Sequence, residues 1–139
     1  MAIRFTDEMK LAINNALANK TPCLIATASR KGEPTFSYRG SMMVFDDQRL
    51  AWWERGQRKN FQHIQENPRV MVAYVDFSKG HAWKIYGNAQ VYPTGPMREQ
   101  VMQRTVPAEL NYDPERKGVA IVVDVALIAD FMDNPLQTK

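Results

Sequence analysis

The sequence predicts a mainly β protein of the α+β class, built on an antiparallel sheet or barrel with short flanking helices. Extended apolar runs recur along the chain, and short polar turns separate them, which is typical of antiparallel strands. Three other segments instead carry their apolar residues at helical spacing. At 139 residues the chain has the length of one domain, residues 1–139, with enough apolar residues to form a core.

The first predicted element is a helix that begins after Thr6. Thr6 suits an N-cap position, and Asp7 and Glu8 follow in the first turn, where the helix dipole favours negative charge. One apolar stripe then recurs at helical spacing: Met9, Ala12, Ile13, Ala16 and Leu17. The turn at residues 19–22 ends this helix, which we expect to pack against the core and to carry no chemistry.

Strands are predicted next, at residues 22–28, 35–45 and 50–54, with polar turns between them. Gly40 divides the second run into two strands. A further strand at 83–92 contains Gly87, and a glycine inside a strand indicates a bulge or a close backbone approach. Residues 96–104 have helical spacing, and residues 106–118 form a polar connection. The last strand runs from Val119 to Val125 and extends toward residue 131 before a polar tail.

Residues 50–75 organise the rest of the chain, because they combine a strand, a basic turn, a short helix and another strand. The basic turn holds Arg55, Gly56, Arg58 and Lys59, and the helix runs from residue 60 to residue 66 before Asn-Pro ends it. A cationic turn that leads into a helix N-terminus suits an anion, because free backbone N–H groups add to the side-chain charges. The alternative is a solvated surface cluster, which is the commoner role of such residues.

The composition is that of an ordinary globular protein, with 45% hydrophobic and 10% aromatic residues. The 18 basic and 15 acidic residues leave a net charge of +3, which is too small to indicate nucleic-acid binding by itself. The N-terminus has no apolar signal segment, and no run approaches the roughly 20 apolar residues of a membrane span. We therefore expect a cytoplasmic protein with no nucleic-acid or membrane partner.

The single cysteine, Cys23, excludes an internal disulfide and a cysteine-based zinc site. It lies in the apolar run CLIATA, where we expect a buried small residue and not a nucleophile. His63 and His81 are the only histidines, too few for a histidine-rich metal site, so no metal is expected. We expect His63 to lie on the surface or to pack within the short helix, and His81 to lie in a turn.

Three segments resemble the pyridoxamine 5′-phosphate oxidase-like, FMN-binding split barrels. In RGQRKNFQHIQENPRV, a basic pair follows a glycine-containing turn, a short helix ends in Asn-Pro, and a strand begins with Arg-Val. CLIATASRKGEPTFS is similar to the first hairpin of that family, and WKIYGNAQVY to its strand with an apolar-Gly-x-Ala centre. The resemblance covers about residues 8–130.

The resemblance implies an antiparallel Greek-key split barrel that forms a homodimer, with FMN in a cleft between the two subunits. The positions that match the flavin contacts of the family are Tyr38, Arg39, Gly40, Ser41, Met42, Met43, Trp52, Trp53, Arg58, Lys59 and, across the subunit interface, Trp83. Core or dimer packing is an equal alternative for Trp83, and a surface charge is the alternative for Arg39.

The resemblance also implies a role for each of these positions. Arg58 and Lys59 would bind the phosphate, Arg39 the phosphate or the ring edge, and Ser41 would donate a hydrogen bond. Gly40 would let the backbone approach the isoalloxazine ring. Strand alternation sends Trp52 and Trp53 to opposite faces, so that only one of them lines the site.

The implied function is that of an FMN-dependent oxidoreductase acting on an unidentified small organic substrate. No catalytic residue is identified, because the flavin carries the redox chemistry itself. The final residues, ADFMDNPLQTK, contain no arginine. The chain therefore departs from the oxidase of the family, whose basic C-terminal segment binds the substrate phosphate, and we do not expect pyridoxamine phosphate to be oxidised.

Three alternatives remain open at this stage. A deazaflavin-dependent reductase would use the same basic turn, with Arg30, Lys31 and Arg55 widening the positive surface. A non-catalytic protein could store or sense a flavin or haem. Nucleic-acid binding, suggested by the pI near 9.1, predicts a steep dependence on salt.

Overall fold

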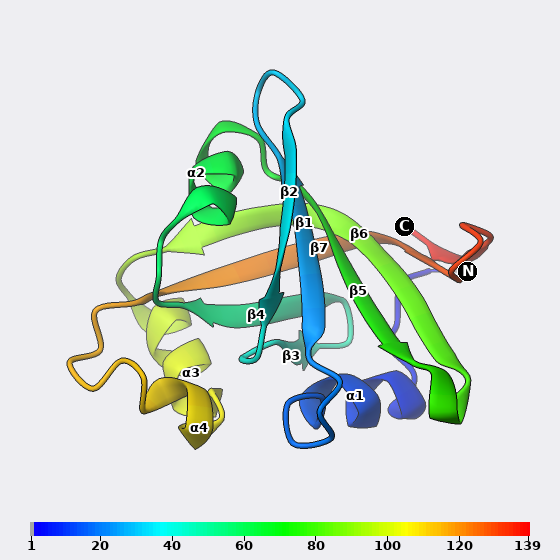
Figure 1. Ribbon diagram of the computed structural model, residues 1–139, viewed down its shortest axis with the longest axis horizontal. Helices are drawn as coiled ribbons and strands as arrows, with labels where there is room; N and C mark the ends of the chain where they lie inside the picture. Colours follow the sequence, from blue (N-terminus) through cyan, green and yellow to red (C-terminus); the bar gives the residue numbers. More distant parts are fainter. Residues whose placement is uncertain (1) are drawn as a thin grey trace.

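A computed structural model describes residues 2–139 as one curved antiparallel sheet of eight strands with short helices around it (Figure 1). The elements are α1 (Asp7–Asn14), β1 (Cys23–Ala28), β2 (Pro34–Arg39), β3 (Met43–Asp46), β4 (Arg49–Glu54), α2 (Lys59–Glu66), β5 (Arg69–Asp76), η1 (Phe77–Lys79), β6 (His81–Tyr92), α3 (Pro96–Arg104), α4 (Pro107–Leu110), β7 (Val119–Ala129) and β8 (Pro135–Thr138). The mainly β antiparallel split barrel with short flanking helices is thereby confirmed.

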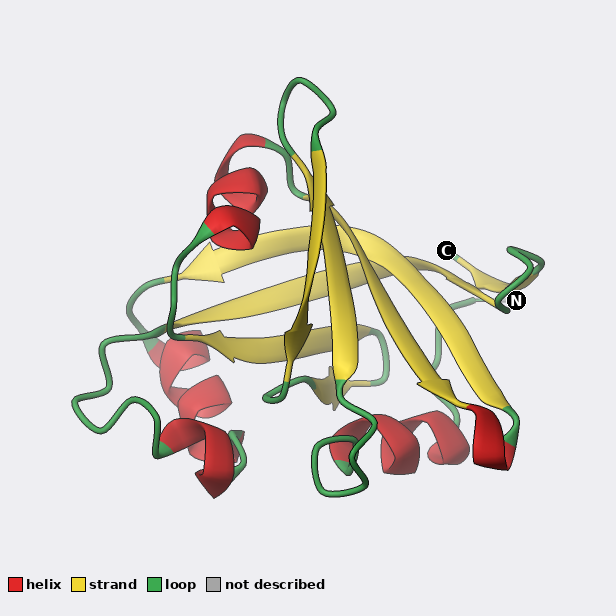
Figure 2. Ribbon diagram, viewed as in Figure 1, coloured by secondary structure: helices red, strands yellow, loops and turns green. Residues whose placement is uncertain are grey.

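The strands follow the order β2-β1-β5-β6-β7-β4-β3 in the sheet, and β8 pairs with β7. Consecutive strands β2 and β3 therefore lie at the two ends of this path, and the sheet stays open between them. The long strands β6 and β7 curve through the middle of the molecule (Figure 2). Among residues 2–139, no helix combines the length and the apolar character needed to cross a bilayer.

The main core lies on the inner face of the sheet. The burial of β1 alternates along the strand, so that Cys23 and Ile25 point inward and Leu24 points outward. Helix α1 covers one end of this core, and the Thr6 side chain caps it by accepting a hydrogen bond from the Met9 amide at 3.1 Å. As expected, Cys23 is buried, and burial raises the pKa of its thiol to about 12.

A smaller core lies on the opposite face of β4 and β7, beneath α3. Trp52 belongs to the main core and Trp53 to the smaller one, so strand alternation sends them to opposite faces as predicted. This second core matters for the site, because it fixes one wall of the cleft described below.

Two elements arise where the sequence suggests only irregular chain. Helix α4 begins at Pro107, whose ring fixes φ in the helical range and which needs no amide donor at a first helical position. Strand β8 forms in the polar tail because β7 pairs with it and the Gln137 side chain bonds the backbone of Arg4 in both directions. At Gly87 the pairing of β6 with β7 shifts register, which confirms the expected bulge.

Candidate functional site

A cleft of about 360 Å³ lies where the end of β4 meets the start of α2, strand β2 and helix α4. In Figure 1 the end of β4 lies between α2 above and α4 below. The cleft is lined by residues 35–39 of β2, by residues 53–60 from β4 into α2, and by Glu109 of α4. Residues 50–75, which the sequence analysis singled out, therefore supply most of the wall of the cleft.

The basic turn brings Arg58 and Lys59 to the start of α2. Gln57 adopts a left-handed conformation with φ of 47°, and Arg58 takes the N-cap position without a side-chain hydrogen bond to the first helical turn. The N–H groups of that turn are thus left without a side-chain cap and add to the positive end of the helix dipole. Arg58 and Lys59 are exposed, and neither has an ion pair within residues 2–139.

Arg39 also lines the cleft, but its guanidinium is bound inside the protein. Its Nε lies 2.7 Å from Glu54 Oε1 and its Nη2 lies 3.0 Å from Glu54 Oε2, which makes a two-pronged ion pair. Nη1 donates to Ser37 Oγ and to the Tyr38 carbonyl. Glu54, whose side chain is only 2% exposed, accepts a third bond from the Trp52 indole at 2.8 Å. The charge of Arg39 is therefore neutralised in this structure.

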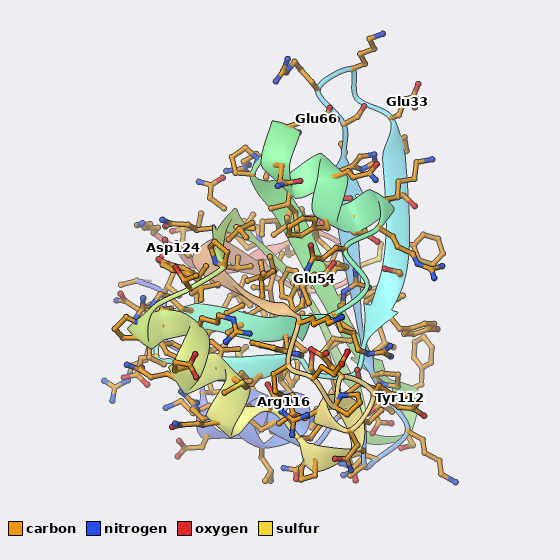
Figure 3. All side chains as sticks on the ribbon, turned by 90° about the vertical axis from the view of Figure 1, so that its left-hand side faces the viewer. Glu33, Glu54, Glu66, Tyr112, Arg116 and Asp124 are labelled. Carbon is orange, nitrogen blue, oxygen red and sulfur yellow. The ribbon has the colours of Figure 1, made fainter. Side chains whose placement is uncertain are left out.

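A chain of hydrogen bonds continues from this ion pair to α2. The Ser37 hydroxyl donates to Asn60 Oδ1 at 2.5 Å, and Asn60 Nδ2 donates to Thr27 Oγ1 at 2.9 Å. Thr27 in turn bonds His63 Nδ1 at 2.9 Å, and His63 is buried. His63 thus packs within the short helix, one of its two expected places, and the network joins β2, β4 and α2 around the cleft (Figure 3, which labels Glu54).

Trp53 is one of the residues that line the cleft, but it is only 2% exposed, and its ring is held in the smaller core. Its indole Nε1 donates to Asp113 Oδ2 at 2.9 Å, and the Arg98 guanidinium lies 4.8 Å from the ring centroid. Asp113 also accepts from the amides of Lys117 and Gly118. Burial alone raises the pKa of Asp113, but these hydrogen bonds outweigh burial and leave the pKa below its ordinary value.

Replacing Asp113 by asparagine is expected to lower the free energy of unfolding by about 1–2 kcal/mol near neutral pH, because an amide cannot accept all three bonds. The lowered pKa means that the carboxylate stabilises the fold fully above its ordinary pKa of 3.8, and that this contribution is lost as pH falls through the lowered value. Urea unfolding at several pH values measures this. The difference in the free energy of unfolding between the wild type and Asp113→Asn should be constant from about pH 7 to 5 and should shrink below about pH 4. Asp124→Asn, which removes an exposed carboxylate of β7, is the control. A loss of unfolding free energy in Asp113→Asn that does not change with pH would contradict the stabilising role of the Asp113 carboxylate.

The structure brings five of the eleven predicted site residues into the cleft: Tyr38, Arg39, Trp53, Arg58 and Lys59. Gly40 and Ser41 lie beside it, and the Ser41 hydroxyl bonds the Trp53 backbone at 3.1 Å instead of pointing into the cleft. The others are buried in the two cores of this chain: Met42, Met43, Trp52 and Trp83.

Trp83 stacks against Tyr74 and His81 at centroid distances of 5.7 and 4.9 Å, so packing accounts for it within one subunit. His81 opens β6 directly after the η1 turn, close to the turn position that the sequence suggests. Sequence reasoning missed Glu109, which lies in a segment read as a polar connection. Glu54 was not among the predicted site residues either, although it accepts three hydrogen bonds at the cleft.

Comparison with known proteins gives one family. A sequence profile described as pyridoxamine 5′-phosphate oxidase matches residues 9–128 of the chain. The comparison with curated protein sequences gave no match.

Solved structures share the fold. The HupZ protein of Group A Streptococcus superimposes with a TM-score of 0.74 and 22% identity, over 97% of this chain and 99% of that one. An FMN-binding protein from Syntrophomonas wolfei gives a TM-score of 0.66 and 14% identity, over 96% and 90%. A structure named F420 reductase gives a TM-score of 0.56 and 18% identity, over 78% and 89%. At these identities the likeness supports the fold alone.

Proposed function

Because the chain belongs to the pyridoxamine 5′-phosphate oxidase family, we propose that it is a homodimeric oxidoreductase that binds FMN in this cleft and acts on a small organic substrate. The observation that carries the proposal is the pair Arg58 and Lys59 at the uncapped N-terminus of α2. A phosphate monoester fits this arrangement, since it accepts hydrogen bonds from a guanidinium fork, an ammonium group and backbone N–H groups together.

The other residues of the cleft fit supporting roles. FMN, when bound, supplies the hydride and electron transfer itself. The chain would bind its phosphate through Arg58 and Lys59, and Trp53, which lines the cleft from the smaller core, would lie nearby. In this proposal Arg39 and Glu54 hold β2 and β4 in place, and Arg39 is not a phosphate ligand as long as Glu54 binds it.

An exposed apolar face of the sheet supports the homodimer. Phe36 and Tyr38 of the edge strand β2 are 69% and 62% exposed. The register places Phe36 opposite Ala26, Ala26 opposite Met71, and Met71 opposite Tyr86, so one outward-facing row crosses four strands. Phe36 and Tyr38 belong to the strand segment that lines the cleft, although alternation directs their side chains away from those of Ser37 and Arg39. An exposed apolar row of this kind is typical of an interface, and a second subunit on it would lie next to the cleft.

The likeness to F420 reductase favours one alternative, a deazaflavin coenzyme in the same cleft. Its additional anionic tail would call for cations beyond the α2 turn. Arg30 and Lys31 at the exposed β1–β2 hairpin tip, together with Arg55 in the cleft, are the candidates. A wild-type protein that binds the deazaflavin coenzyme but not FMN would favour this alternative.

The first experiment is an absorption spectrum of the purified protein before and after FMN is added and the excess removed, followed by a titration of Arg58→Ala/Lys59→Ala. We expect the double variant to bind FMN roughly 100-fold more weakly, because two exposed charge-assisted hydrogen bonds contribute about 1.5 kcal/mol each. Arg30→Ala/Lys31→Ala removes the same charge at the hairpin tip and should bind FMN as the wild type does. Equal FMN affinity in a folded Arg58→Ala/Lys59→Ala variant would contradict the phosphate assignment.

A further inference from the structure

The side chain of Glu109 lies in the cleft close to Gly40. Hydrogen bonds from its amide to the Val106 carbonyl (3.0 Å) and from the Tyr112 amide to its own carbonyl (3.1 Å) fix its backbone. A Cβ built on Gly40 would lie 2.9 Å from both Cδ and Oε2 of Glu109. The absent side chain at position 40 therefore leaves room for a carboxylate directed at the cleft.

This carboxylate is poorly satisfied compared with its neighbour Glu54. Glu54 accepts three hydrogen bonds. Glu109 is 18% exposed, and within residues 2–139 its side chain makes no hydrogen bond. In the described part of the chain it forms one ion pair, with Arg55, whose Nε lies 3.9 Å from Oε1. The Glu109 carboxylate keeps part of its surface in water, so a ligand that displaces this water would have to supply a hydrogen-bond donor in its place.

Arg55 completes a donor–acceptor pair with Glu109. Its guanidinium lies 4.7 Å from the centroid of the Tyr112 ring, on the α4 side of the cleft, and its side chain is more exposed than that of Glu109. The Glu109 carboxylate, an acceptor, and the Arg55 guanidinium, a donor, thus lie next to each other at one wall of the cleft. The fully cationic pair Arg58 and Lys59 stands at the start of α2. A carboxylate repels a phosphate, so the two places suit different parts of one ligand.

We propose that Glu109 and Arg55 recognise a neutral imide or lactam edge, with Glu109 accepting from the ring N–H and Arg55 donating to the adjacent carbonyl. This inference rests on the proposed function, in which that edge is the pyrimidine ring of the flavin. Glu109 would set ligand orientation and would favour ring systems that carry an N–H at this position over those in which it is alkylated.

The test uses riboflavin and N3-methylriboflavin as probes, because both lack the phosphate and differ only in the ring N–H. Dissociation constants are measured by flavin fluorescence for the wild type, Glu109→Gln and Glu109→Leu. The wild type should bind riboflavin about tenfold more tightly than N3-methylriboflavin, as expected for a charge-assisted hydrogen bond. Glu109→Leu should bind the two alike, and Glu109→Gln, which keeps an acceptor but loses the charge, should show an intermediate preference.

The controls separate this inference from the FMN assignment. Glu115→Gln removes an exposed carboxylate from the adjacent loop and should keep the full preference of the wild type. Arg58→Ala/Lys59→Ala should lose FMN affinity and yet keep the riboflavin preference. A folded Glu109→Leu variant that still prefers riboflavin would overturn the imide assignment while FMN binding stands. A wild type that binds none of the three flavins would overturn both proposals.

Discussion

Replacing Glu54 by glutamine is expected to lower the free energy of unfolding by about 3 kcal/mol, the low end of the cost of removing one partner of a buried ion pair. The variant leaves the Arg39 guanidinium, which is 19% exposed, without its carboxylate. It also weakens the acceptor of the buried Trp52 indole. The low end applies because Arg39 keeps some contact with water.

Thermal and urea unfolding measure this loss, which corresponds to a fall in Tm of roughly 10 °C for a chain of this size. Glu33→Gln, at the exposed hairpin tip (Figure 3), should be nearly neutral. The double variant Arg39→Met/Glu54→Leu should be less destabilised than the sum of its single changes, because an apolar pair leaves no unpaired charge. A Tm for Glu54→Gln within about 2 °C of the wild type would refute the buried pair as a stabilising element.

Replacing Gly87 by alanine is expected to cost about 3 kcal/mol or more, since overpacking at an immobile backbone site lies at the upper end of its range. A Cβ there would lie 2.3 Å from the Asp124 carbonyl oxygen and 2.7 Å from Val123 Cγ1. The first contact is with the backbone of β7, which pairs with β6, β4 and β8 and cannot shift without disturbing all three.

Gly56→Ala is the matched control, because the nearest atom to its added Cβ is Arg58 Cγ at 3.9 Å. Circular dichroism and urea unfolding of the two variants make the comparison. We expect Gly56→Ala to unfold like the wild type, and Gly87→Ala to lose stability or to accumulate as insoluble protein. Equal stability of the two variants would show that the bulge can relax, against the geometry of β6 and β7.

Sequence patterns predicted those elements whose structure depends on contacts between residues close together in the chain. The spacing of Met97, Val101 and Met102 predicts α3, and the basic turn predicts where Arg58 and Lys59 stand at the start of α2. Gly87 could be assigned to a bulge because a glycine has few other roles inside a strand. In each case the residues that decide the structure are neighbours in the sequence.

Contacts between distant segments could not be predicted in the same way. Arg39 pairs with Glu54 because β2 and β4 approach the same end of the cleft, which depends on the path of the whole sheet. Glu109 reaches Gly40 across a sequence separation that no periodicity encodes. Alternation separates Trp52 from Trp53, but only the packing of α3 and of the loop at Asp113 decides that Trp53 is the one next to the cleft.

The open edge of β2 has a consequence for handling the protein. An unpaired edge strand presents N–H and C=O groups to any other extended chain, and here it also carries two exposed aromatic side chains, Phe36 and Tyr38. A single subunit thus has both unpaired backbone groups and an exposed apolar surface, and both promote aggregation. Dilution, or a mutation on the exposed apolar face, that separates the subunits of the proposed dimer should therefore reduce solubility before it reduces secondary structure.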